Sequence, residues 1–61
     1  MVNKIKDFRE QRDLKLKELA EKVDITAGYL RKIEKGEGTP SLKLAVRIAK
    51  VLDCTLDDLF F

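Results

Sequence analysis

The side chains that could act together chemically are concentrated in one short segment, residues 26–35. If this segment is a helix, its outward positions are Thr26, Gly28, Tyr29, Arg31, Lys32 and Lys35. Three cations and a tyrosine on one helix face suit a polyanion, because lysine and arginine neutralise phosphate groups. The spacing alone is equally compatible with DNA binding and with an ordinary solvated helix face, so both interpretations stay open here.

Few other residues offer chemistry. The 61 residues include no His and a single cysteine, Cys54, so the ligand cluster that a metal site needs is missing. Cys54 is expected to be a buried, inert thiol, because no second Cys is present. Asp57 and Asp58 are adjacent carboxylates at an expected helix start, where the helix dipole favours them, and we do not interpret them as an acid/base pair. We expect a binding module and not an enzyme, with no metal, cofactor or small-molecule ligand.

The composition indicates one small domain spanning residues 1–61. Hydrophobic residues make up 44% of the chain and charged residues 39%, which argues against both disorder and a membrane span. The N-terminus lacks the apolar run of a secretory signal, and one Cys fits a reducing compartment, so we expect a cytoplasmic protein. All 13 Lys and Arg precede residue 51, whereas the last eleven residues contain only acidic charges. This split permits a body that faces a polyanion and a different role for the tail.

Apolar residues recur with a period near 3.6 and strict alternation is absent, so the sequence predicts an all-α fold of five short helices. The expected helices cover about residues 3–11, 16–22, 26–35, 40–52 and 55–61. Thr26 and Thr55 are suitable N-caps, and Pro40 is expected in the first turn of the fourth helix. The second and third helices, joined by a tight turn at Asp24, form a helix-turn-helix over about residues 16–35.

The same periodicity assigns the side chains that face the core. In the first helix the inward positions are Ile5, Phe8 and Arg12. In the third helix they are Ala27, Leu30 and Ile33. The fourth helix has a broad apolar face of Leu42, Ala45, Val46, Ile48, Ala49 and Leu52.

Four short motifs carry a resemblance to a known family. They are Glu18-Leu19-Ala20, the run from Tyr29 to Gly36, Pro40-Ser41-Leu42, and Leu56 to Phe60. In this order and spacing they resemble the phage-repressor (Cro/CI, XRE-type) helix-turn-helix family. The resemblance implies a lambda-repressor-like DNA-binding domain of a transcriptional regulator. It also implies a semi-buried structural ion pair between Arg9 and Glu34.

The chain departs from the family pattern where members usually contact DNA. Lys15 and Leu16 replace the usual Thr-Gln pair, so Lys15 or Lys17 is expected to contact phosphate instead. Ala27 and Gly28 replace residues that often read bases, and of these two only Ala27 has a side chain that can touch a thymine methyl. Direct readout is therefore expected from Lys32, with Arg31 or Tyr29.

These observations predict a sequence-specific regulator, a repressor, that binds double-stranded DNA as a homodimer with the third helix in the major groove. The expected dimer contacts are Val51, Leu56, Phe60 and Phe61. The alternative is that Leu59 and Phe60 fill the domain's own core while Phe61 frays. A second hypothesis is a protein-interaction module of the same fold, antitoxin-like or an anti-repressor partner, with weak DNA binding.

Overall fold

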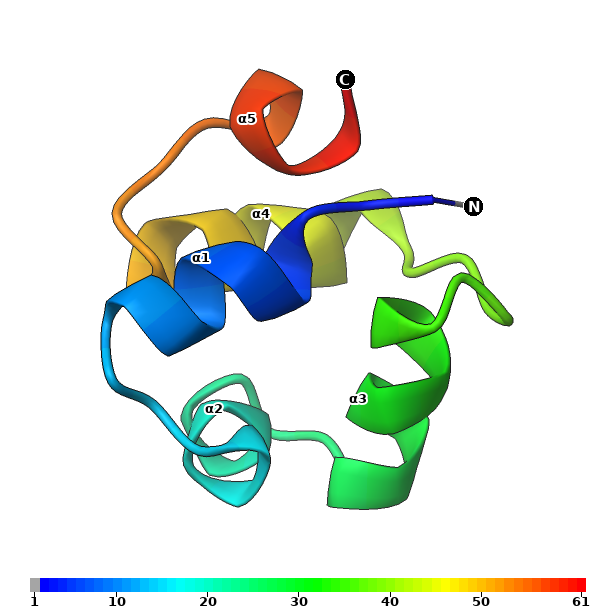
Figure 1. Ribbon diagram of the computed structural model, residues 1–61. Coiled ribbons are helices and arrows are strands. Elements are labelled where there is room, and N and C mark those ends of the chain that lie inside the picture. Colours follow the sequence, from blue (N-terminus) through cyan, green and yellow to red (C-terminus); the bar gives the residue numbers. More distant parts are fainter. Residues whose placement is uncertain (1) are drawn as a thin grey trace.

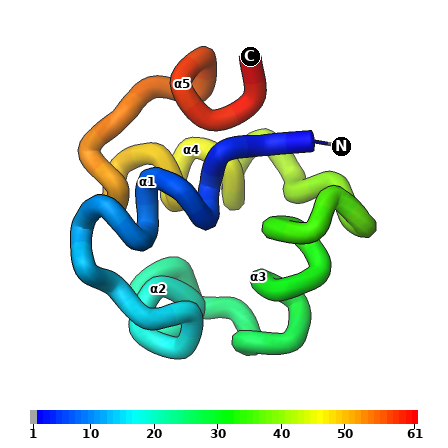
Figure 2. The backbone as a smooth tube through the Cα atoms, viewed as in Figure 1, coloured from blue at the N-terminus to red at the C-terminus, as the bar shows by residue number. Residues whose placement is uncertain are grey.

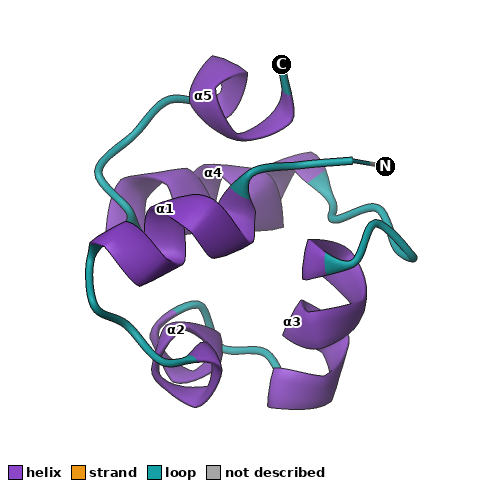
Figure 3. Cartoon of the chain, viewed as in Figure 1, coloured by secondary structure: helices purple, strands orange, loops and turns teal. Residues whose placement is uncertain are grey.

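The computed structural model describes residues 2–61 (Figure 1). Its helices are α1 (Ile5–Gln11), α2 (Leu16–Lys22), α3 (Ala27–Glu34), α4 (Leu42–Val51) and α5 (Leu56–Phe60). No strand is present in the described residues, and the predicted all-α fold of five short helices is confirmed (Figure 3). None of these helices has the length and apolar character that a membrane crossing requires.

The arrangement of the helices separates two ends of the molecule. α1 and α4 cross its middle, with α5 on one side of them and α2 and α3 on the other (Figure 2). α4 packs against both α2 and α5, and α2 packs against α3. The N-terminal segment is tied to α5, because the Lys4 N–H donates to the Leu59 carbonyl at 2.8 Å. α2 and α3 pack together at the end of the molecule opposite α5 (Figure 2).

Every helix contributes to one hydrophobic core. The largest fully buried side chains are Ile5, Leu19, Val23, Leu30, Ile33, Ile48, Leu52 and Leu59. Burying such a side chain contributes about 1.5–3 kcal/mol relative to leaving it in water. Because a domain of this size buries only about 60% of its chain surface, these few residues must supply most of the hydrophobic stabilisation.

Three of the predicted core positions are wrong. Val46 is only half-buried and lines a shallow surface trough with Lys43 and Arg47. Leu42 is 72% exposed, because no other helix covers that side of the first turn of α4. Arg12 is exposed at the end of α1, with its guanidinium carbon 5.2 Å from the centroid of the Phe8 ring. The buried cation of α1 is Arg9 instead. Helical spacing places Arg12 and Arg9 on neighbouring sides of the same face, so periodicity alone does not distinguish them.

Two predicted helix starts also differ from those in the structure. α1 begins at Ile5 and not at residue 3, because the Asn3 Oδ1 accepts a hydrogen bond from the Ile5 N–H at 3.1 Å while its Nδ2 donates to the Ile33 carbonyl at 2.8 Å. Pro40 precedes α4 and is not in its first turn. Ser41 is the N-cap, with its hydroxyl accepting from the Leu44 N–H at 3.1 Å.

Three helices end on an aspartate in the left-handed conformation: Asp13, Asp24 and Asp53 have φ of 57°, 62° and 54°. Each takes part in a pair of hydrogen bonds that form a Schellman motif, and after α2 these are Ile25 N–H to Ala20 C=O and Asp24 N–H to Glu21 C=O. Glycine usually occupies this position, because an L-residue with a Cβ is strained there. Aspartate is among the few other residues that tolerate it.

The turn of the helix-turn-helix provides a test of this strain. Replacing Asp24 by Gly should leave the stability unchanged or raise it by up to about 1 kcal/mol, because glycine adopts positive φ without a clash. Asp24→Ala should lower it by about 1 kcal/mol, since alanine keeps the Cβ and loses the polar side chain. Urea unfolding of both variants measures the difference, and equal stabilities would contradict the role assigned to Asp24.

Two groups at the start of α5 have shifted pKa values, Asp58 and Cys54. Thr55 is the N-cap of α5. Hydrogen bonds from the backbone N–H and the side chain of Thr55 to the Asp58 carboxylate hold the pKa of Asp58 below its usual value. Asp58 therefore remains charged at neutral pH. Cys54 is half-buried, and desolvation raises the pKa of its thiol although Arg12 acts in the opposite direction. A raised pKa disfavours the thiolate and is in keeping with the expected inert thiol.

Candidate nucleic-acid interface

The interface is built on α2 and α3, which pack against each other through buried side chains. Leu19, Ala20 and Val23 of this pair lie in the core with Leu30 and Ile33. The chain turns sharply at Asp24, and Thr26 then caps α3 by accepting from the Tyr29 N–H at 3.1 Å. The turn and the cap together fix where α3 starts relative to α2.

The outward side of α3 carries the cations that the periodicity assigned to it. The exposed residues of this segment are Thr26, Gly28, Tyr29, Arg31, Lys32 and Lys35. Ala27 differs from them, because it is half-buried and packs against the core. Gly28 has open space around it, since a Cβ added there would meet no atom within 4 Å, so the surface at this point is flat and accessible.

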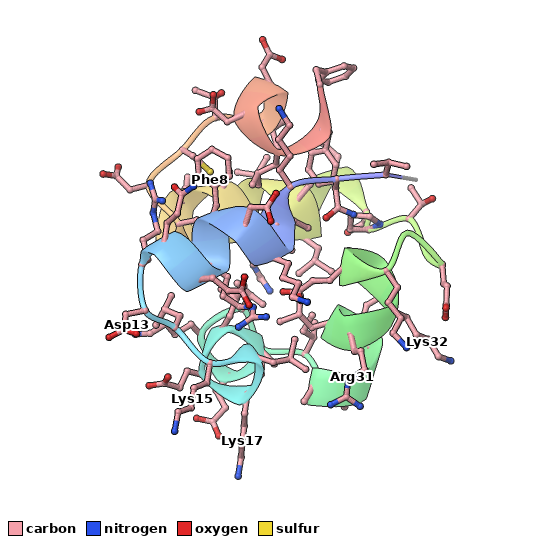
Figure 4. The ribbon with its side chains drawn as sticks, in the orientation of Figure 1. Phe8, Asp13, Lys15, Lys17, Arg31 and Lys32 are labelled. Atoms are coloured by element: carbon pink, nitrogen blue, oxygen red, sulfur yellow. The ribbon has the colours of Figure 1, made fainter. Side chains whose placement is uncertain are left out.

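Side chains of α2 and of its N-cap extend the basic surface. Lys15 and Lys17 are exposed, and both project with Arg31 toward the end of the molecule that α2 and α3 form (Figure 4). Lys32 projects from α3 in a different direction, away from α2 (Figure 4). The Lys15 backbone N–H donates to the Glu18 carboxylate at 2.8 Å, so Glu18 helps to cap the N-terminus of α2.

The one acidic side chain within α3, Glu34, is turned inward to Arg9. Arg9 Nε lies 2.8 Å from Glu34 Oε2, and Arg9 Nη2 donates to Oε1 at 3.2 Å. A third donor, Nη1, binds the Leu14 carbonyl at 2.8 Å. The two side chains are only 10% and 6% exposed. This pair connects α1 to α3 and removes the negative charge of Glu34 from the outer face.

A hollow of about 340 Å³ lies over this ion pair, between α1, α2 and α3. Its lining residues are Lys6, Arg9, Leu16, Arg31, Glu34 and Lys35. Lys6 was not among the predicted site residues, because it lies in α1, outside the helix-turn-helix. Its position in the first turn of α1 offers no local signal, and it joins Arg31 and Lys35 only through the packing of α1.

The predicted dimer residues lie at the other end of the molecule. Leu56, Phe60 and Phe61 line a groove of about 270 Å³ together with Pro40, Leu42 and Ala45, which we call the C-terminal groove. Phe60 is half-buried against the core, whereas Phe61 is 91% exposed. Val51 does not line the groove, because it is half-buried against the core.

Residues 2–61 contain no group of three side chains that could hold a metal ion.

The helix-turn-helix family profile matches residues 5–59 of this chain. An HTH-type transcriptional regulator of Methanocaldococcus jannaschii, MJ0272, is 40% identical over 60 residues, covering 98% of this chain and 91% of the relative. The clp gene regulator ClgR of Corynebacterium glutamicum superposes with a TM-score of 0.84 at 30% identity, and the match spans 88% of this chain but only 57% of ClgR. SinR, a master regulator for biofilm formation solved in complex with DNA, gives a TM-score of 0.79 at 33% identity over 87% of this chain and 86% of SinR.

Proposed function

This chain belongs to the HTH_3 helix-turn-helix family of transcriptional regulators, and from that premise we propose that it represses transcription in the cytoplasm by binding double-stranded DNA sequence-specifically as a homodimer. The observation that carries the proposal is the outer face of α3, whose exposed charges are all positive because Glu34 is buried on Arg9. The likeness to SinR, which was solved with DNA bound, supports the same use of the fold.

In this proposal α3 enters the major groove and the start of α2 lies over the phosphate backbone. Lys15, Lys17 and Lys35 are assigned to phosphates, which set the affinity and the orientation of the domain without reading sequence. Lys6 joins them, because it shares the hollow with Arg31 and Lys35.

Base readout is assigned to the middle of α3. Lys32 and Arg31 carry donors that suit the acceptors of guanine, and Tyr29, 40% exposed, can contact the groove edge. Ala27 is half-buried, so its contribution is limited to a methyl contact with thymine. Gly28 makes no side-chain contact and lets the backbone approach the base edges.

The homodimer is proposed because one such module buries only roughly 600–1,000 Å² on DNA, which is little for tight specific binding. Two copies place two recognition helices about 34 Å apart, one turn of DNA. Repression follows when the bound dimer occludes the promoter.

The dependence of affinity on salt tests the proposal directly. If three of the four lysines assigned to phosphates in each subunit neutralise a phosphate, log affinity should fall linearly with log salt with a slope on the order of −5, because each contact releases about 0.9 counterions. Fluorescence anisotropy with a labelled duplex, repeated at several salt concentrations, measures the slope. An affinity that does not change with salt would exclude the proposed phosphate contacts.

The second candidate function is a protein-interaction module of the same fold, antitoxin-like or an anti-repressor partner. It is favoured by the exposed Leu42 and Phe61 beside the C-terminal groove, which offer an apolar surface outside the outward face of α3. The salt experiment distinguishes the two functions, because an interaction module should bind a generic duplex barely at all.

A further inference from the structure

The outer face of α4 carries a row of cations that the proposed DNA interface does not use. Lys43, Arg47 and Lys50 follow one another at spacings of four and three residues, so they lie along one side of the helix. All three are exposed, and none forms an ion pair with an acidic side chain of residues 2–61. Since α4 itself contains no Asp or Glu, nothing on the helix neutralises this basic row.

An apolar strip runs along α4 directly beside the basic row. Leu42 and Val46 lie one helical turn apart, and with the three cations they line a shallow trough, which we call the α4 trough. Leu42 is 72% exposed and Val46 is half-buried, so the rest of the domain removes neither side chain fully from water. With 3.6 residues per turn, both apolar positions lie to the same side of all three cations. The α4 trough is therefore apolar along one edge and positively charged along the other.

We infer that the α4 trough binds an amphipathic helix of a partner protein, one whose apolar stripe is bordered by Asp and Glu along a single flank. The apolar side chains of such a helix pack on Leu42 and Val46, while its carboxylates pair with the basic row. The ten residues of α4 span about 15 Å, so the contact extends over roughly three turns of the partner. The inference goes beyond the proposed DNA binding, because it uses none of the side chains assigned to DNA.

The apolar strip favours a protein over a nucleic acid as the occupant. A phosphate backbone would pair with Lys43, Arg47 and Lys50, but it has no apolar group with which to cover Leu42. Covering an exposed leucine is favourable in proportion to the apolar area that leaves the water. An amphipathic acidic helix matches both edges of the trough, whereas a nucleic acid matches only the basic one.

A second copy of this chain lacks the helix that the trough requires. The helices α1 to α4 all contain Lys or Arg, which the basic row would repel. α5 contains only acidic charges, but it has five residues, and its Leu59 is buried in the core. Its Asp58 already accepts a hydrogen bond from the Thr55 N–H at 2.9 Å. The occupant is therefore assigned to a different protein.

A synthetic peptide is the probe for the α4 trough. It has about 16 residues, since shorter helices are marginal in water, with leucines one turn apart and glutamates along one flank of the leucine stripe. A control peptide has the same composition, with its glutamates spread evenly around the helix. The parent protein, without DNA, should bind the first peptide at least about tenfold more tightly than the control. Fluorescence anisotropy of the labelled peptides gives both dissociation constants.

Substitutions in the trough should weaken peptide binding, whereas matched substitutions elsewhere should not. Arg47→Glu and Leu42→Ser should each raise the dissociation constant by about tenfold, the first by repelling the glutamates and the second by removing an apolar contact. Lys22→Glu makes the same charge change on α2, and Phe61→Ser removes an exposed apolar side chain from the C-terminal groove. Both controls should keep the dissociation constant within about twofold of the parent's. Circular dichroism checks that every variant is folded.

Losses confined to Arg47→Glu and Leu42→Ser support the inference. If Leu42→Ser binds as tightly as the parent, the basic row takes up a polyanion such as a nucleic acid, and if Phe61→Ser is weakened too, the peptide lies in the C-terminal groove. Either result overturns the inference, as does equal binding of the two peptides or an equal loss in Lys22→Glu. Self-association of the parent that Arg47→Glu abolishes, measured by sedimentation equilibrium, would assign the trough to a second copy instead. DNA affinity is measured separately, so a failure of the proposed function does not alter this result.

Discussion

Replacing Glu34 by alanine should destabilise the domain by about 3–5 kcal/mol, because it leaves Arg9 as an unpaired charge in a site that water hardly reaches. Arg9 is 8% exposed and uses two of its nitrogens on the Glu34 carboxylate. Domains of this size are stable by an amount near the low end of about 5–15 kcal/mol. A loss of this size should lower the melting temperature by more than about 12 °C, and thermal unfolding followed by circular dichroism measures it.

Two further variants separate the ion pair from other effects. Glu37→Ala removes an exposed acid three residues later and should change the stability by no more than about 0.5 kcal/mol. Replacing both partners, Arg9→Met with Glu34→Leu, should recover most of the loss, since no charge is then left buried alone. If the melting temperature of Glu34→Ala lies within about a degree of the parent's, the Arg9–Glu34 pair is exposed to water and contributes nothing to stability.

Lys32→Glu should weaken DNA binding by about a hundredfold or more while leaving the fold intact. A contact of this kind contributes about 1–3 kcal/mol, and a homodimer loses it twice. The new carboxylate is also repelled by the phosphates on either side of the groove. Because Lys32 is exposed, its replacement removes no core contact and the melting temperature should barely change. The measurement is a titration at one fixed salt concentration, with a duplex selected from a random library.

Lys4→Glu is the matched control, because it makes the same charge change at an exposed residue beside α5, outside the outward face of α3. It should reduce the affinity by less than about threefold through the change in net charge alone. Equal losses in the two variants would mean that overall charge drives binding and that α3 has no special position on DNA.

Much of the fold could be predicted from the sequence, because the signals involved act over a few neighbouring residues. The 3.6-residue period placed Leu30 and Ile33 inside, and the same spacing placed Arg31, Lys32 and Lys35 outside. Thr26 and Thr55 were expected as N-caps from their position before an apolar run, and both accept the expected backbone hydrogen bond. Such features depend on one helix at a time and on residues within one turn of each other.

Other features were decided only when helices from different parts of the chain came together. The periodicity alone put Arg12 and Leu42 in the core, but no helix covers Leu42, and the partner for a buried cation, Glu34, lies beside Arg9 instead. Lys6 joins Arg31 and Lys35 across a hollow between α1, α2 and α3, over the Arg9–Glu34 pair that connects α1 to α3. Periodicity indicates which side of a helix is apolar. Whether a charged side chain on that side is buried, or a leucine there is exposed, depends on the residues that the neighbouring helices place opposite it. Tertiary packing determines those neighbours.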